Sequence, residues 1–268
     1  MTYNYWMQKY LLILPLWVLG LTSLAVMTVN SDWAYLGWTV FFYLLFGGFG
    51  TTVGLHRYWT HQTFEMSMFW QRFCTLMGAF NGQGPLFVWI ANHEDYHHKY
   101  SDTEKDPHSP DKGFFHALVT WTTKSDASSY KELAENPRRL ARSLVKYKKF
   151  FEDPWNLFVD KWFLAILWGT VALVALIDWK ISLYGIVLAV FYNQIAQGMS
   201  NTFGHYRWAG YRNYDTNDNS VNNPFLALFT LGELNHNNHH GNWKSWKLSK
   251  NWYEPDFGGL IVDLIRKK

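Results

Sequence analysis

The sequence predicts an all-α integral membrane protein whose four transmembrane helices form two hairpins below a histidine-rich, helical cytoplasmic cap. Four stretches are apolar over close to the 20 or so residues that a helix needs to cross a bilayer. Aromatic residues make up 19% of the 268 residues, including 16 Trp, which is typical of aromatic belts at a membrane interface. A mean hydropathy of −0.19 indicates that much of the chain lies outside lipid. We therefore expect one domain, residues 1–268.

The predicted spans are residues 10–29, 33–55, 157–177 and 181–203. Only three residues separate the first pair of spans, from Asn30 to Asp32, and three separate the second pair, from Asp178 to Lys180. Turns this short make the two helices of each pair antiparallel neighbours. The first span has no basic leader or small-residue cleavage site, so we expect a retained helix rather than a cleaved signal peptide.

The distribution of positive charge predicts the orientation. Of the 24 Lys and Arg residues, 14 lie in residues 56–161 and eight lie in residues 204–268. By the positive-inside rule, the cap (residues 56–156 and 204–268) and both termini are cytoplasmic. Residues 64–91 are apolar but interrupted by Gly and Pro, so we expect interfacial or re-entrant helices there rather than a fifth span. The net charge of +3 and the absence of basic runs with interleaved aromatics argue against nucleic-acid binding.

Eight of the eleven histidines form three clusters on the predicted cytoplasmic side. The clusters are His56 and His61; His93, His97 and His98; and His236, His239 and His240. Imidazole is a good ligand for iron, copper, nickel and zinc, and a carboxylate-poor set disfavours magnesium and calcium. Eight imidazoles exceed the needs of one four-coordinate zinc, so the number indicates two metals. We expect His108 and His116 to be ordinary solvated or hydrogen-bonded residues.

The spacing predicts which histidines share a helix face. Residues four apart lie about 40° apart around an α-helix, which places His93 with His97 and His236 with His240. Residues five apart diverge by about 140°, as would His56 and His61. The adjacent pairs His97-His98 and His239-His240 would then point to two sides of their helices, as expected for ligands that surround two nearby metals.

The clusters resemble those of the membrane fatty acid desaturase family, in its acyl Δ9-type branch, whose pattern is HxxxxH, HxxHH and HNxHH. The similarity continues, in order, over roughly residues 10–265. It includes Gly82-Gln83-Gly84-Pro85 with Trp89, Asp106-Pro107-His108-Ser109-Pro110 with Trp121, Asn201 with His205, Gly232-Glu233, and Trp252-Tyr253-Glu254-Pro255-Asp256.

The resemblance implies an O2-dependent desaturase that introduces a cis double bond into a fatty acyl chain carried by CoA, carrier protein or glycerolipid. Two iron ions would be held by nine histidines, with His205 as the ninth, and Asn201 would hold a metal-bound water. The sequence has no HPGG haem motif of a fused cytochrome b5, so electrons would come from a separate ferredoxin or cytochrome b5-type donor. The nine are His56, His61, His93, His97, His98, His205, His236, His239 and His240.

Further residues are expected around the metals. Carboxylates should accept the second N–H of each imidazole; Asp106 and Glu233 are favoured, and Glu94, Asp95, Asp102 and Asp256 are further candidates. An acyl tunnel would be lined by Gln83, Phe87, Trp89, Trp121 and the second and fourth spans. A basic rim for a carrier or lipid phosphate would comprise Arg72, Lys99, Lys105 or Arg207. Ordinary core packing and a generic positive-inside surface explain these residues as well, and Cys74 is expected to be a buried apolar residue.

Two departures leave the reaction open. The second cluster, HxxxHH, is one residue longer than the family pattern, so His93 can be a ligand only if its helix is wound differently or the metal is approached from a shifted angle. Leu234 and Asn235 stand where the family usually has Gly and Trp, which affects the lining of the site. A lipid hydroxylase or acetylenase of the same fold, a zinc membrane hydrolase and a non-enzymatic metal sensor remain as alternatives.

Overall fold

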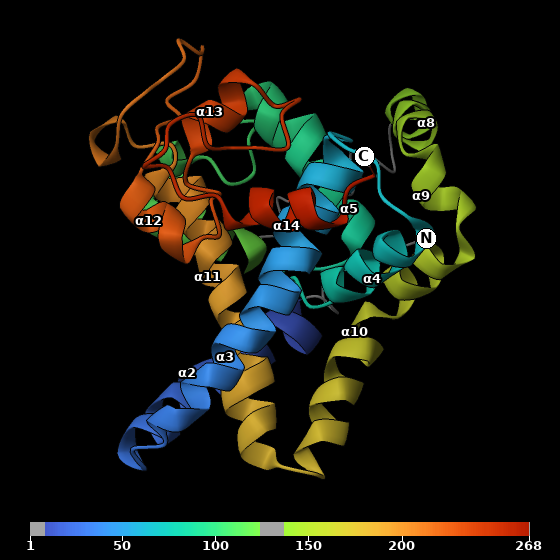
Figure 1. The fold of residues 1–268 in the computed structure, drawn as a ribbon, viewed down its shortest axis with the longest axis vertical. Helices are drawn as coiled ribbons and strands as arrows, with labels where there is room; N and C mark the ends of the chain where they lie inside the picture. The colour runs from blue at the N-terminus through green and yellow to red at the C-terminus, as the bar shows by residue number, and fades with distance from the viewer. Residues whose placement is uncertain (1–8, 124–136, 268) are drawn as a thin grey trace.

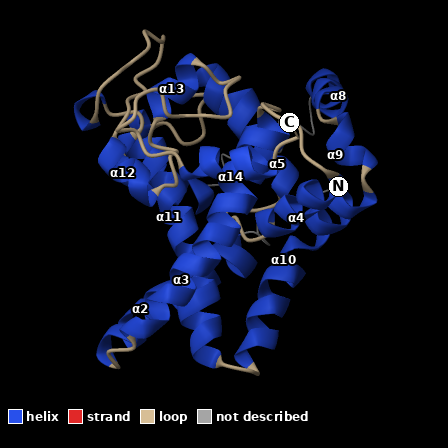
Figure 2. Ribbon diagram, viewed as in Figure 1, coloured by secondary structure: helices blue, strands red, loops and turns tan. Residues whose placement is uncertain are grey.

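The computed structural model describes residues 9–123 and 137–267, and the regular elements in these two segments are helices. Outside the helices the described chain pairs only through isolated β-bridges (Figure 2). The all-helical prediction is therefore confirmed for the described part of the chain.

Two helical hairpins project from the cap toward one end of the molecule (Figure 1). The first hairpin joins η1 (Lys9–Ile13) and α2 (Leu14–Val29) to η2 (Trp33–Tyr35), α3 (Leu36–Tyr43) and η3 (Leu44–Thr60). The second joins α10 (Pro154–Ala175) to η7 (Ile181–Val187) and α11 (Leu188–Phe203). An ion pair links the two turns, because Lys180 Nζ lies 2.8 Å from Asp32 Oδ1.

Three of these helices are long and apolar enough to cross a membrane: Lys9–Val29, Trp33–Thr60 and Pro154–Ala175. The fourth predicted span, residues 181–203, is helical throughout, but its second half carries buried polar side chains such as Asn193 and Gln194. These side chains lower its hydropathy while they face the protein interior. The four-span topology therefore stays a prediction.

The second span is longer than predicted. Its helix continues to Thr60, past the predicted end at residue 55, so His56 lies inside the helix rather than in the cap. Glycines let α4 (Met68–Gly78) pack closely against this part of η3: a Cβ on Gly50 would approach the carbonyl oxygen of Met77 to 2.5 Å. Cys74 is buried at this contact, as expected.

The remaining helices form the cap at the other end of the molecule (Figure 1). After α4 come α5 (Leu86–Asn92), η4 (His93–His98), η5 (Pro110–Lys112), α6 (Phe114–Leu118), η6 (Thr120–Thr123), α8 (Pro137–Lys146), α9 (Lys148–Glu152), η8 (Arg207–Ala209), α12 (Pro224–Phe229), α13 (His236–Gly241) and α14 (Phe257–Ile265). The helices α4 and α5 have 11 and 7 residues, too few to cross a bilayer. The turn between them uses Gly82 and Gly84, whose φ angles are +77° and +128°.

Candidate metal centre

The nine histidines predicted as ligands come together in two groups at the cap end of the molecule. The first group comprises His56, His61, His93, His98 and His239, and the second comprises His97, His205, His236 and His240. Within each group, one nitrogen of every ring lies within 4.8 Å of the corresponding nitrogens of the others. Residues from four separate stretches of the chain therefore converge on two adjacent points.

Helix winding explains the first group. Both η3 and η4 are π-helices, whose hydrogen bonds join residues five apart and so bring the side chains of residues i and i+5 closer to one face than an α-helix does. His56 and His61 have ring centroids 4.9 Å apart, and His93 and His98 have centroids 4.7 Å apart. The expectation that His56 and His61 diverge by about 140° is therefore wrong, because it assumed α-helical winding.

The same winding accommodates the extra residue of the second cluster. In an α-helix His93 would share a face with His97, but in η4 it pairs with His98, while His97 turns to the second group. By contrast α13 is α-helical, so His236 and His240 share the second group and His239 turns to the first. Each adjacent histidine pair is thus divided between the two groups.

The nitrogen positions fit metal ions. The Nε2 atoms of His56 and His239 are 3.0 Å apart, and those of His205 and His236 are also 3.0 Å apart. Two nitrogens bound at right angles to one metal at about 2.1 Å would be separated by about 3.0 Å. The buried Nε2 atoms of His97 and His240 have no hydrogen-bond partner. Converging nitrogens without acceptors are the arrangement that two metal ions would satisfy.

Carboxylates contact the Nδ1 atoms on the outer side of both groups. The distances are 2.6 Å from His56 to Glu233, 3.4 Å from His61 to Glu94, 3.0 Å from His97 to Asp106, 3.1 Å from His205 to Asp102 and 2.6 Å from His240 to Asp218. Such contacts fix the ring and its tautomer, and they leave Nε2 free for a metal. The structure thus brings both favoured carboxylates, Asp106 and Glu233, to the site.

Two other candidate carboxylates contact side chains outside the histidine groups, and one carboxylate that does contact a histidine was not predicted. Asp95 accepts a hydrogen bond from the Ser143 hydroxyl, and Asp256 forms an ion pair with Arg57 at 2.8 Å. The missed residue is Asp218, in the loop before α12. Its acidic character in a polar loop was the only available signal, since it is 22 residues from His240 and belongs to none of the motifs.

Burial keeps most of the imidazoles neutral. It lowers the pKa of His61, His93, His98, His236 and His239 well below the ordinary value. Burial alone would raise the pKa of Glu233, but the neighbouring His56 and Arg57 hold it below its usual range. Neutral rings backed by ionised carboxylates are the protonation states that metal binding requires.

The two remaining histidines are both engaged within the protein. His108 Nδ1 lies 3.2 Å from Asp106 Oδ1, its ring packs against Trp121, and burial lowers its pKa to about 3. His116 Nε2 is hydrogen-bonded to the Pro107 carbonyl oxygen at 2.8 Å. Both therefore fit the expected structural role, although His108 also borders the second group through His97.

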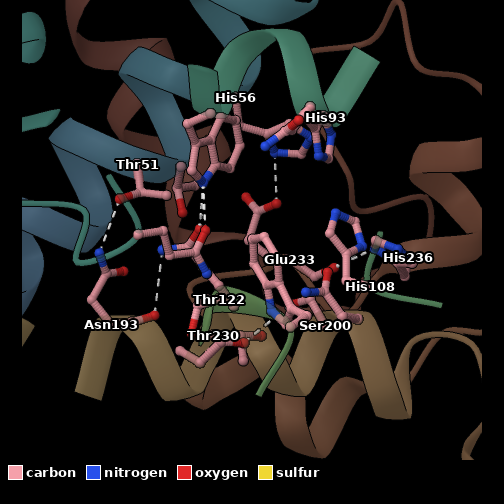
Figure 3. A pocket seen from close by; sticks show the side chains of 18 of the residues that line it. Thr51, His56, His93, His108, Thr122, Asn193, Ser200, Thr230, Glu233 and His236 are labelled. Carbon is pink, nitrogen blue, oxygen red and sulfur yellow. Dashed lines mark hydrogen bonds and ion pairs between the residues drawn. The ribbon is translucent and has the colours of Figure 1, made fainter. Parts of the chain in front are cut away.

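A cavity adjoins both groups and extends between the hairpins. His56, His93, His236 and Glu233 line it (Figure 3). Asn201 is another of the residues that line it. The predicted tunnel residues Gln83, Trp89 and Trp121 line the same cavity. The Trp89 Nε1 donates hydrogen bonds to the side-chain oxygens of Gln83 and Gln197, at 2.8 and 2.7 Å. The second and fourth predicted spans contribute Thr51, Thr52, Asn193 and Ser200.

Other predicted residues lie away from this cavity. Phe87, which was expected to line the tunnel, is not among the described residues that line this cavity; it packs in the core against Phe151, with ring centroids 4.6 Å apart. Since residues two apart point to nearly opposite sides of an α-helix, Trp89 in the cavity wall leaves Phe87 facing outward from the cavity. None of the residues proposed for a basic rim is among the described residues that line this cavity. One of them, Arg72, instead forms an ion pair with Asp153.

Residues 31–242 match the family model for fatty acid desaturases. The chain belongs to the fatty acid desaturase family. It is 31% identical to the sn-1 stearoyl-lipid 9-desaturase of Anabaena variabilis over 238 residues, covering 88% of this chain and 82% of that protein. It is 27% identical to the Delta(9)-fatty-acid desaturase fat-5 of Caenorhabditis elegans, covering 91% and 75%. It is 32% identical to the acyl-CoA desaturase of Cyprinus carpio, covering 75% and 62%.

Membership of the desaturase family confirms the resemblance found in the sequence, including its Δ9-type branch. The family consists of oxidoreductases and implies an iron cofactor, which agrees with the imidazole-rich donor set. The apolar helices and the family together identify a membrane protein.

Proposed function

We propose that the protein is an O2-dependent fatty acyl desaturase that introduces a cis double bond into a lipid acyl chain. One observation carries the proposal: two groups of buried imidazole nitrogens converge beside a cavity that reaches His56, His93 and His236. Chemistry at a methylene group needs the reacting carbon held against the oxidising centre, and this cavity provides the place.

Two iron ions would occupy the two histidine groups, and when bound they would supply O2 activation and cleavage of unactivated C–H bonds. Glu233 and Asp106 hold His56 and His97 with Nε2 directed inward. Asn201 and His236 both line the cavity, and Asn201 would hold a water beside the second group. The carboxylates would act by orienting the rings and by fixing the proton on Nδ1, which leaves Nε2 free to bind a metal.

The cavity would hold the acyl chain. Its polar side chains mostly bond to one another or to the backbone, as Trp89 does with Gln83 and Asn193 does with Thr51. Polar groups that already have hydrogen-bond partners add little free-energy cost when an apolar chain covers them. Relatives are named for stearoyl-lipid and for acyl-CoA substrates. We infer an acyl ester as substrate, with CoA, carrier protein or glycerolipid as the carrier.

The remaining parts of the proposal concern the membrane. Residues 181–203 would be the fourth span, and the cap with both termini would face the cytoplasm because it carries most Lys and Arg residues. The whole chain, residues 1–268, would then act as one domain. A ferredoxin or cytochrome b5-type protein would supply electrons from the cytoplasmic side.

Lipid analysis in a host that lacks this activity tests the proposal. Cells expressing the wild-type protein should gain a monounsaturated acyl chain, located by double-bond mass spectrometry, and cells expressing His97→Ala should not. A hydroxylated lipid without a new alkene would identify a hydroxylase instead. Two zinc ions together with O2-independent turnover would identify a hydrolase, and an unchanged function of His97→Ala in cells would favour a metal sensor.

A further inference from the structure

Two tryptophans make described ring contacts with the nine histidines, and they occupy different surroundings. Trp89 stacks on His93 at 5.0 Å and lines the cavity. Trp243 contacts His61, with ring centroids 6.1 Å apart, and is 42% exposed. The first metal group is thus connected to the substrate cavity by one indole and to the protein surface by another.

Trp243 does not lie where a tryptophan of a membrane interface would lie. It follows α13 directly, and α13 lies at the end of the molecule farthest from the hairpin turns (Figure 1). Interfacial tryptophans sit where spans leave the lipid. A half-exposed indole in the outer part of the cap, in contact with a predicted metal ligand, needs a different explanation.

One lysine lies over this indole, and a second lysine is linked to His61 through a carboxylate. The Lys244 ammonium is 5.3 Å from the centre of the Trp243 ring. Lys146 Nζ lies 2.5 Å from Glu94 Oε1, and the other oxygen of Glu94 is 3.4 Å from His61 Nδ1. An exposed aromatic with basic neighbours is the composition of a docking site for an acidic protein, in which charge steers the encounter and the aromatic makes the close contact.

We propose that Trp243 is the point at which an acidic one-electron carrier protein delivers electrons to the metal centre through His61. This inference rests on the proposed function. Each turnover would convert one CH2–CH2 unit, O2, two protons and two electrons into a CH=CH unit and two waters. Two carrier molecules are oxidised in succession. The indole provides a continuous contact between carrier and ligand, and Lys244 attracts the carrier.

The test uses iron-loaded protein in nanodiscs, mixed anaerobically with reduced plant-type ferredoxin and, in a second arm, with the reduced soluble domain of cytochrome b5. Stopped-flow absorbance follows oxidation of the carrier. Trp243→Leu should slow this step about tenfold or more, and Trp243→Phe should slow it less because an aromatic ring remains. Reduction by dithionite, a small reductant that needs no docking, should be unchanged, as should the iron content.

Trp252→Leu is the matched control, because Trp252 is 95% exposed and its described ring contact is with Tyr253 alone. Binding of oxidised ferredoxin, measured by calorimetry, should weaken roughly tenfold in Lys244→Glu and should weaken with salt in the wild type. Equal slowing with dithionite, an equal effect of Trp252→Leu, or no effect of Trp243→Leu would overturn the inference. So would failure of both carriers to reduce the wild-type protein. If the wild type makes no alkene in cells but Trp243 controls reduction, the proposed function fails and the electron route stands.

Discussion

Glu233→Gln tests the role of the carboxylate that contacts His56 in the first histidine group. Glu233 accepts from His56 Nδ1 at 2.6 Å and from Arg57 Nη2 at 3.2 Å. Glutamine keeps the shape and one acceptor oxygen but removes the charge. Arg57 stays paired, because Asp256 lies 2.8 Å from the same guanidinium nitrogen. The loss is therefore limited mainly to one charge-assisted hydrogen bond.

A hydrogen bond to a charged group contributes about 1.5–3 kcal/mol, so Glu233→Gln should lower the free energy of unfolding by about 2 kcal/mol. Loss of a carboxylate behind a ligand histidine typically weakens metal binding by about 10–100-fold. Glu233→Ala should be more harmful, because it leaves the buried His56 Nδ1–H without any acceptor, which adds about 1–3 kcal/mol.

Iron affinity is measured by chelator competition with elemental analysis, and stability by thermal unfolding in detergent. Glu65→Gln serves as the control, because Glu65 forms an exposed pair with Lys149 that contributes about 0–1 kcal/mol. Wild-type iron affinity in Glu233→Gln would refute the argument that this carboxylate orients His56. Equal losses in Glu65→Gln would show that the effect is not specific to the site.

Three further predictions follow from single contacts. Asp218→Asn should weaken iron binding at the second group about 10–100-fold, because His240 loses the carboxylate that holds its ring, whereas Asp215→Asn, at an exposed position, should have no effect. Equal iron contents of the two variants at limiting iron, measured by elemental analysis, would contradict this prediction. Phe87→Leu should lower stability by about 1 kcal/mol yet leave the double-bond position unchanged, and a shifted double bond in lipid mass spectrometry would contradict its placement in the core. Burial would raise the pKa of Glu254, but hydrogen bonds from a tyrosine hydroxyl and backbone N–H groups hold this pKa below its usual value. The stabilisation by Glu254 is therefore complete above the unfolded pKa of about 4.3 and is lost as the pH falls through the lower folded pKa. Glu254→Gln should be less stable than the wild type at pH 7 and should lose less stability on acidification; an equal loss of melting temperature in both proteins from pH 7 to pH 3 would count against this prediction.

Local signals in the sequence were sufficient to predict the helical hairpins and to single out the nine histidines that gather in two groups. A run of about 20 apolar residues identifies a span without any tertiary information. Histidine clusters likewise identify a metal site from composition and spacing, and Asp106 and Glu233 were found because they lie inside recognisable motifs.

Local sequence signals could not predict the helix winding or the contacts between residues far apart in the sequence. The angle between His56 and His61 depends on which backbone hydrogen bonds form, and an α-helix was the default assumption. The contact of Asp218 with His240, and that of Asp102 with His205, depend on how a loop folds back over the cap. The sequence also could not show that Phe87 packs away from this cavity, because a single aromatic residue near a motif does not reveal which side of its helix faces the cavity.

The π-helical turn of η4 bears on how this family tolerates changes in motif length. A helix that widens by one residue over a single turn absorbs an insertion locally, so the helix before it and the loop after it keep their positions. His93 and His98 reach one group although they are five residues apart. Motif length and metal geometry can therefore vary independently, and deletion of one residue between His93 and His97 should let the turn revert to α-helical winding with both histidine groups intact.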